Sequence, residues 1–118
     1  MSCTIELKDK TILETSVGVF ESLFHEFNNL IEKENLQINK EFELFMEKID
    51  NAIFTLGGVC IDIEKIFHNS NNLELVIFLL EITINKIKYE LRDRAIENLW
   101  KFHGELVKYK EELEALDK

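Results

Sequence analysis

The sequence has no proline and only four glycines among its 118 residues. Proline cannot donate a backbone hydrogen bond and disrupts a helix interior, whereas glycine supplies the unusual backbone angles that many loops require. A chain with so little of either has few points at which a helix must stop. We therefore predict long helices joined by short connections, folded as a single domain over residues 1–118.

The chain is also poor in positive charge. Fourteen basic residues stand against 23 acidic residues, which gives a formal net charge of −9, and all of this excess lies in residues 1–85. Nucleic-acid phosphates and anionic membrane surfaces carry charge of the same sign as the protein. We therefore expect no direct binding to nucleic acid or to a membrane, and we expect any charge-guided partner to be a basic protein.

Cysteine is scarce, with two residues in the whole chain. The first ten residues hold no apolar run of the kind that a signal peptide has, so we expect a cytoplasmic location with reduced thiols. Cys60 lies between two apolar neighbours, and the nearest charges, Asp62 and Glu64, have the wrong sign to activate a thiol. We predict that Cys60 is buried and inert.

No apolar run is long enough to span a bilayer. The most apolar segment, residues 73–84, contains Glu74 and Glu81 and is shorter than the ~20 residues that a transmembrane helix requires. Its apolar residues occupy more than one side of a helix, and such a helix must be surrounded by others. We predict that this segment belongs to the central helix of a bundle, capped by Asn71 and Glu74, with Leu80 fully buried.

Apolar residues recur at three- and four-residue spacings in three further segments, and this spacing places side chains on one face of a helix. Residues 13–31 carry the first such stripe and residues 42–56 the second. The third, residues 95–116, alternates four- and three-residue steps as a heptad seam. Residues 59–67 fit either a short helix or a short buried strand, and we favour the helix, because Ile63, Ile66 and Phe67 fall on one face. The fold is predicted to be all-α, a bundle of about four to five helices.

The boundaries of the second helix can be predicted from its flanking residues. Asn39 precedes the first apolar residue and is expected to be the N-cap. Gly57-Gly58 is expected to end the helix, because glycine accepts a positive φ without strain. The predicted buried stripe of this helix consists of Phe42, Phe45, Ile49, Ile53 and Leu56.

The start of the chain is open to two interpretations. Residues 4–7 and 11–14 are short strand-like segments separated by residues 8–10, and they could pair as a small hairpin. Alternatively, Thr11 and Glu14 form a capping box, in which each side chain bonds a backbone N–H in the first turn of a helix. We favour the capping box and keep a short N-terminal hairpin as the alternative.

Motifs for catalysis or cofactor binding are missing. The single glycine pair has no adjacent lysine and hydroxyl residue, so it does not form a phosphate-binding loop. None of the three histidines follows a glutamate at the three-residue spacing of di-iron bundles. Glu21–His25 and Glu64–His68 have a four-residue spacing, which is more often an exposed helical contact than a metal site. We expect no catalytic residue, no metal and no cofactor.

One charged surface is set apart by its pattern. On a helix over residues 40–56, three carboxylates and one aromatic ring share a face that lies away from the buried stripe: Glu43, Glu47, Asp50 and Phe54. Carboxylates can pair with Arg or Lys, and a ring can anchor in a pocket of a partner. The same pattern also fits solvated carboxylates with the ring covered by another helix. We name these four residues the acidic ridge and nominate them for binding a basic partner, with Asp62 and Glu64 as further candidates.

The segments GGVCIDIEKIF, residues 57–67, and NNLELVIFLL, residues 71–80, carry a family resemblance. In the apolar spacing of residues 57–87, and in its size, acidity and helical character, the chain resembles small acidic immunity proteins of bacterial toxin–immunity pairs. These pairs include those of contact-dependent growth inhibition systems. The resemblance implies a cytoplasmic inhibitor that covers a toxin domain, often a nuclease with a basic surface. It transfers no functional residue, because it contains no motif that can be matched position by position.

A second function is kept beside this one. The heptad seam of residues 95–116 would allow a structural or regulatory protein to self-associate as a homodimer. Salt distinguishes the two functions, because a charged interface weakens as salt rises, whereas an apolar coiled coil does not.

Overall fold

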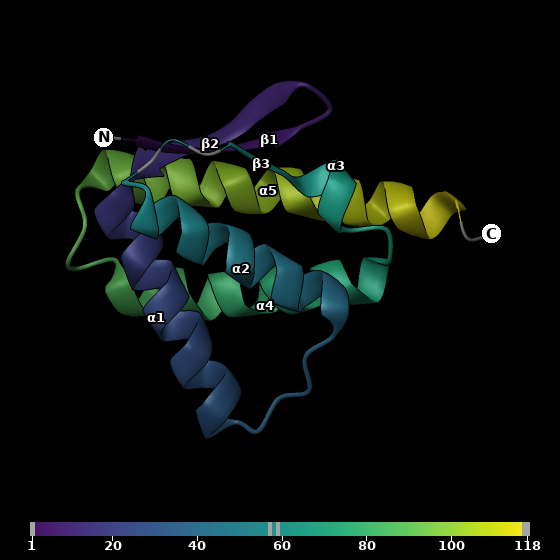
Figure 1. Ribbon diagram of the computed structural model, residues 1–118, viewed down its shortest axis with the longest axis horizontal. Coiled ribbons are helices and arrows are strands. Elements are labelled where there is room, and N and C mark those ends of the chain that lie inside the picture. The colour runs from purple at the N-terminus through teal and green to yellow at the C-terminus, as the bar shows by residue number, and fades with distance from the viewer. Residues whose placement is uncertain (1, 57, 59, 117–118) are drawn as a thin grey trace.

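The computed structural model describes residues 2–56, 58 and 60–116, and it is mostly helical with one small sheet (Figure 1). The sheet contains β1 (Ser2–Leu7), β2 (Lys10–Ser16) and β3 (Cys60–Asp62). The helices are α1 (Val17–Lys33), α2 (Lys40–Phe54), α3 (Ile63–Ile66), α4 (Ser70–Ile87) and α5 (Asp93–Leu116). With five helices in the described residues, the all-α prediction is correct for most of the chain, and the sheet corrects it to mostly α.

The N-terminus forms the hairpin and not the favoured capping box. Thr11 and Glu14 both pair with β1 in an antiparallel ladder, so the capping-box prediction is wrong. The turn consists of Lys8 and Asp9, which have positive φ values of 54° and 63°. Two such residues in succession make a turn whose twist matches that of the flanking strands. α1 follows directly, with Ser16 as its N-cap.

β1 is the central strand of the sheet, whose order is β2-β1-β3. It pairs antiparallel with β2 and parallel with β3, where Ile5 lies opposite Ile61 and both side chains are buried. The segment that fitted either a strand or a helix is both, because the three residues of β3 lead straight into the single turn of α3. Residue 59, which the sequence placed in this segment, lies outside the described residues.

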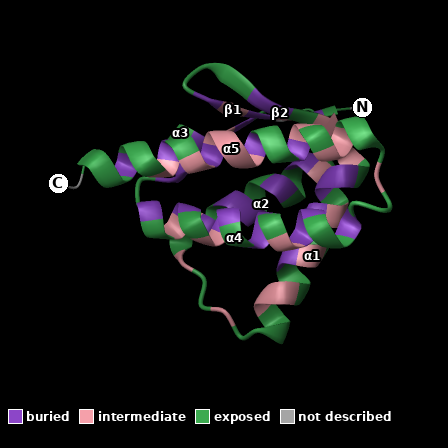
Figure 2. Ribbon diagram, turned by 180° about the vertical axis from the view of Figure 1, so that it is seen from behind, coloured by how far each residue is buried: buried purple, intermediate pink, exposed green. Residues whose placement is uncertain are grey.

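α4 packs against α1, α2 and α5. Leu80 is 0% exposed, as predicted, whereas Phe78 on the outer side is 48% exposed, so α4 is not enclosed on every side. Figure 2 shows the alternation of buried and exposed residues along it. Asn69 is its N-cap and accepts a hydrogen bond from the backbone N–H of Asn71 at 2.8 Å. The predicted capping box of Asn71 and Glu74 is therefore wrong.

α5 lies between α4 and the hairpin, which it contacts through β2 (Figure 1). Tyr109 donates a hydrogen bond to the carbonyl oxygen of Phe67 at 2.9 Å and so joins α5 to the end of α3. The predicted heptad seam is used inside the chain, and its buried residues are Leu99, Phe102, Leu106, Tyr109 and Leu113. The alternative homodimer therefore loses the apolar surface on which it depended. Across the described ranges, no helix is both long and apolar enough to cross a membrane.

Candidate protein-binding surface on helix α2

The cap and the buried side chains of α2 fix its inner face in the core, and this determines which residues form its outer face. Asn39 is the N-cap, as predicted, and its Oδ1 accepts a hydrogen bond from the backbone N–H of Phe42 at 2.9 Å. Phe42, Phe45 and Ile49 are all buried in the core. Because a helix repeats every 3.6 residues, the residues on the opposite side of α2 point away from these three. The last residue of the predicted stripe, Leu56, is 57% exposed, so the prediction is wrong at this position.

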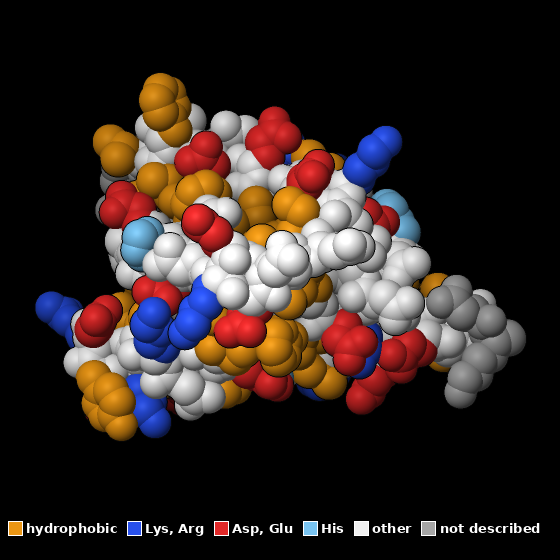
Figure 3. Space-filling model, turned by 90° about the horizontal axis from the view of Figure 1, so that it is seen from below, with side chains coloured by type: hydrophobic (Ala, Val, Ile, Leu, Met, Phe, Trp, Pro, Cys, Tyr) orange, Lys and Arg blue, Asp and Glu red, His pale blue; other side chains and the backbone are white. Residues whose placement is uncertain are grey.

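All four residues of the acidic ridge are exposed on the outer side of α2. From Glu43 to Phe54 the ridge extends about 16 Å along the helix axis, at the usual rise per residue. Phe54 is 87% exposed, which excludes the alternative in which another helix covers its ring. Figure 3 shows acidic side chains in a row along the upper part of the view, with apolar side chains at one end of the row.

The carboxylates of the ridge have no partner in the part of the chain that the structure describes, because none of them forms an ion pair or hydrogen bond there. Glu43 and Glu47 are four residues apart, a spacing at which like charges destabilise a helix by about 0.2–0.5 kcal/mol. Glu41 differs, because it accepts hydrogen bonds from His68 N (3.2 Å) and Asn72 Nδ2 (2.8 Å). The ridge thus directs unpaired negative charge into solvent.

Leu56 adds a second exposed apolar side chain at the end of the ridge that holds Phe54. The last helical residue is Phe54. The N–H of the C-cap Thr55 donates to the carbonyl oxygen of Asn51 at 2.9 Å, and Leu56 then takes a positive φ of 56°. Gly58 does not take the left-handed φ that was expected of the glycine pair, and residue 57 lies outside the described residues. Sequence reasoning missed this apolar end because it extended the helical period beyond Thr55.

The two further candidates, Asp62 and Glu64, lie at the start of α3. Asp62 is half-buried and caps α3, where its Oδ1 accepts a hydrogen bond from the backbone N–H of Glu64 at 3.0 Å. It also borders a hollow between α2 and β3 that includes Lys48 and Lys65. Glu64 lies close enough to α5 to affect Tyr109, because desolvation and then the charge of Glu64 raise the pKa of Tyr109. Both carboxylates therefore belong to the surroundings of α3.

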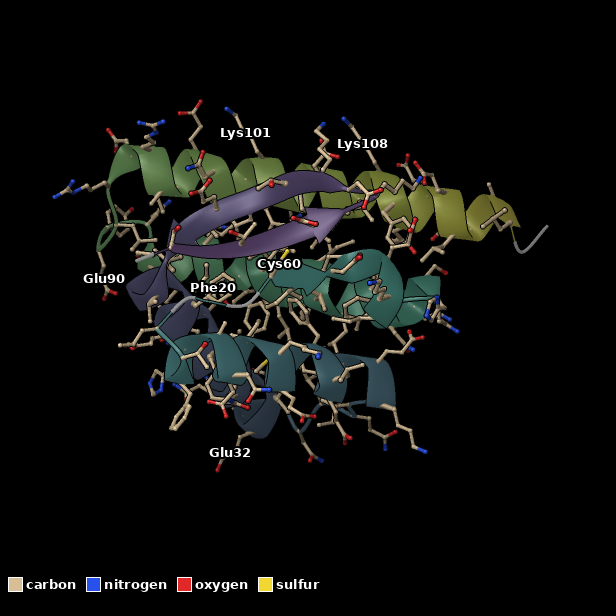
Figure 4. The ribbon with its side chains drawn as sticks, turned by 45° about the horizontal axis from the view of Figure 1, so that its top comes forward. Phe20, Glu32, Cys60, Glu90, Lys101 and Lys108 are labelled. Carbon is tan, nitrogen blue, oxygen red and sulfur yellow. The ribbon has the colours of Figure 1, made fainter. Side chains whose placement is uncertain are left out.

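Cys60 is exposed at the start of β3, so the prediction of a buried cysteine is wrong (Figure 4). The apolar neighbours suggested burial, but successive side chains of a strand point to opposite faces, and in β3 only Ile61 is buried. Desolvation, a hydrogen bond with Glu6, and the charges of Glu6 and Asp62 raise the pKa of Cys60 to about 11. Since the thiolate is the reactive form, this thiol reacts slowly at neutral pH.

Two of the three histidine rings lie beside a single polar side chain. His25 Nε2 lies 3.2 Å from Asn29 Nδ2, and His103 Nε2 lies 2.8 Å from a carboxylate oxygen of Glu81. Within the described residues, no three side chains of His, Cys, Asp or Glu are grouped so that they could hold a metal ion.

Comparison of the chain with protein-family models, with curated proteins and with solved structures gave no match in any of the three. No relative therefore assigns a role to any residue. The function is inferred from the surface of α2, where unpaired negative charge meets an exposed aromatic ring.

Proposed function

We propose that this chain is a bacterial, cytoplasmic, protein-binding inhibitor of the immunity type, which neutralises a basic toxin domain by forming a tight complex through the acidic ridge. The observation that carries the proposal is the row of unpaired carboxylates on α2, which ends in the exposed ring of Phe54. We infer binding and not catalysis as its activity.

The arrangement supplies two different contributions to binding. Burial of a phenylalanine side chain is worth about 1.5–3 kcal/mol, so Phe54 would act as an anchor in a pocket of the partner. The carboxylates would pair with Arg or Lys, and charged pairs that lose their water after docking discriminate strongly between partners. An apolar anchor beside a charged row is thus suited to a partner that is basic around a pocket.

A nuclease is the partner that fits this charge best. Its surface must be basic, because it binds the phosphates of nucleic acid. An inhibitor with unpaired carboxylates can occupy the same basic groups. Opposite charge also speeds encounter, from roughly 10⁵–10⁶ M⁻¹s⁻¹ for neutral pairs to about 10⁸–10⁹ M⁻¹s⁻¹ at low salt. Rapid capture benefits an inhibitor that must act before the toxin does.

The first test compares two variants with the same change in net charge. Glu43→Lys/Glu47→Lys alters the ridge, whereas Glu90→Lys/Glu111→Lys alters exposed glutamates elsewhere that have no ion pair among the described residues. Each protein is immobilised and used to capture partners from a bacterial lysate. We expect the wild type and the control variant to retain a basic protein that the ridge variant loses. Equal capture by all three would contradict the placement of the site.

The second test examines the anchor and the inhibition. Phe54→Ala should speed dissociation of the captured protein by about 30-fold, which corresponds to an anchor worth ~2 kcal/mol, whereas Phe78→Ala on α4 should not. The purified partner should degrade nucleic acid, and an excess of the wild-type chain should stop it. If the partner binds the ridge but has no toxic or nuclease activity to inhibit, the ridge stands as a binding site and the inhibitor function fails.

A further inference from the structure

A second surface, separate from α2, runs along the edge of β2. β2 is an edge strand, since β1 is its only neighbour in the sheet order β2-β1-β3. In an antiparallel pair, alternate residues direct their N–H and C=O groups away from the partner strand. Among the described residues, no further backbone hydrogen bond occupies these outward groups of β2. These N–H and C=O groups could therefore form hydrogen bonds with an added strand.

α5 forms the opposite wall of a groove along this edge. Three adjoining hollows lie between β2 and α5, and neighbouring hollows share lining residues, so that together they make one continuous groove. We name it the edge groove. It runs from Lys10 and Lys108 near the hairpin turn to Ser16 and Arg94 at the other end. Figure 4 shows Lys101 and Lys108 projecting from α5 beside the hairpin.

The edge groove is basic although the protein is acidic. Its lining has two acidic residues, Glu14 and Glu105, against four basic residues: Lys10, Arg94, Lys101 and Lys108. Glu105 is shared between Lys10 (3.9 Å) and Lys108 (3.7 Å), so one carboxylate faces two ammonium groups. The side chains of Lys10, Lys101 and Lys108 are 71–73% exposed and can turn toward a ligand.

Gly104, in the middle of α5, lies in the floor of the groove. A Cβ atom at this position would meet nothing within 4 Å, so packing within the chain does not require a glycine. Glycine in a helix interior lowers stability relative to alanine. Packing thus gives no reason for a glycine in α5, and the missing side chain leaves the groove open between Lys101 and Lys108.

We propose that the edge groove binds an extended acidic peptide segment of a partner protein, which adds to β2 as a fourth strand and directs its carboxylates toward the lysines of α5. In strand addition, main-chain hydrogen bonds supply affinity and alternate side chains supply specificity. The register shift in the β1–β2 ladder leaves Ile12 without an opposing residue. The regular pairing therefore forms along Leu13 to Ser16, and the lysines beyond this bulge hold the rest of the peptide.

Charge and hydrogen bonding select this ligand over two others. Nucleic acid would satisfy the lysines but would not pair with the alternating donors and acceptors of a strand edge. A second copy of this chain, joined strand to strand through β2, would bring two basic grooves together, and like charges would oppose it. The inference does not depend on the function of the acidic ridge, which lies on α2.

The test uses a fluorescein-labelled, seven-residue peptide of alternating Glu and Val, matched in length to β2. Binding to the full chain is measured by fluorescence anisotropy at low salt. We expect Lys101→Glu/Lys108→Glu to weaken binding by more than about tenfold, as the loss of two charged contacts predicts. Lys33→Glu/Lys40→Glu, which makes the same charge change on α1 and α2, should have a much smaller effect.

Gly104→Gln gives an independent test, because it fills the groove without changing its charge. We expect weaker peptide binding and a melting temperature no lower than that of the wild type, since glutamine is a good helix former. A peptide with N-methyl groups on alternate amides should also bind weakly, because it cannot add to a strand. Three results would overturn the proposal: equal binding of the methylated peptide, tighter binding of a single-stranded oligonucleotide of equal charge, or dimerisation through β2 that excludes the peptide.

Discussion

The outer face of α2 and the solvent-facing sides of α5 are both rich in charge, but only α5 pairs its charges. Of the eight ion pairs among the described residues, seven include a residue of α5 and none includes a residue of α2. In α5, Glu97 lies 3.7 Å from Lys101 at a four-residue spacing. In α2, Glu43 and Glu47 occupy the same spacing with like charge. On α2, therefore, the candidate binding face is distinguished by charge that the fold leaves unpaired, and not by the amount of charge.

The largest expected difference in stability is between alanine substitutions on the two faces of α2. Phe45 is 1% exposed and Phe54 is 87% exposed, although both lie on the same helix. Phe45→Ala should destabilise the protein by about 3–5 kcal/mol, through lost transfer free energy and the cavity left behind. Phe54→Ala should change stability by less than about 0.5 kcal/mol. Urea unfolding followed by circular dichroism measures both, and a cost above about 1 kcal/mol for Phe54→Ala would mean that its ring is covered.

Leu80 tests whether α2 and α5 rest on one shared core. It is fully buried in α4, which contacts both helices. Leu80→Ala should cost about 2–5 kcal/mol. Thermal unfolding should remain a single transition, because both helices lose the same support. Separate transitions for the two regions would contradict a common core.

Much of the contrast between α2 and α5 could be predicted from the sequence, because it depends on the spacing of residues within each helix. The cap at Asn39, the exposed row on α2 and the heptad seam of α5 all follow from the 3.6-residue period. The hairpin was kept only as the alternative, because Lys8 and Asp9 take positive φ values without the Asn-Gly signal of such turns. Pairing of β1 with β3, the exposure of Cys60 and the edge groove each depend on segments far apart in the chain, which no local pattern reveals.

A smaller change in stability is expected at alkaline pH, and it comes from Cys60. Cys60 has a pKa of about 11 in the folded protein, against an ordinary value of 9.0. The folded state keeps a proton that the unfolded chain loses, so this stabilisation is complete below pH 9 and disappears as pH rises toward about 11. Cys60→Ser should therefore lose less stability than the wild type between about pH 8 and pH 10.5 in urea unfolding.

Tyr109 contributes to the same decline in both proteins, because its pKa is also raised, by desolvation and then by nearby carboxylates. The difference between the wild type and Cys60→Ser isolates the thiol. Identical pH profiles for the two proteins would show that neither desolvation nor the neighbouring Glu6 and Asp62 raises the pKa of Cys60.

The smallest expected changes in stability come from single charge pairs on α2 and α5. Glu47→Lys would place a lysine four residues after Glu43, so we expect α2 to gain about 0.2–0.5 kcal/mol. Lys101→Glu would create the like-charge pair on α5, so we expect a loss of similar size. A gain in stability for Glu47→Lys and a loss for Lys101→Glu, both smaller at high salt, would support the contrast between α2 and α5. Changes of the same sign would show that the two helices do not differ in this way.

The most direct test of the ridge is the rate at which the captured basic partner associates with it. Stopped-flow measurements at low and high salt would compare the wild type with Glu43→Lys/Glu47→Lys and with Glu90→Lys/Glu111→Lys. We predict that the ridge variant associates at least about tenfold more slowly at low salt and that its rate depends less on salt than the wild-type rate, because steering charges have been reversed at the contact. The control should stay close to the wild type. Equal slowing in both variants would contradict the account, because net charge alone would then explain the binding.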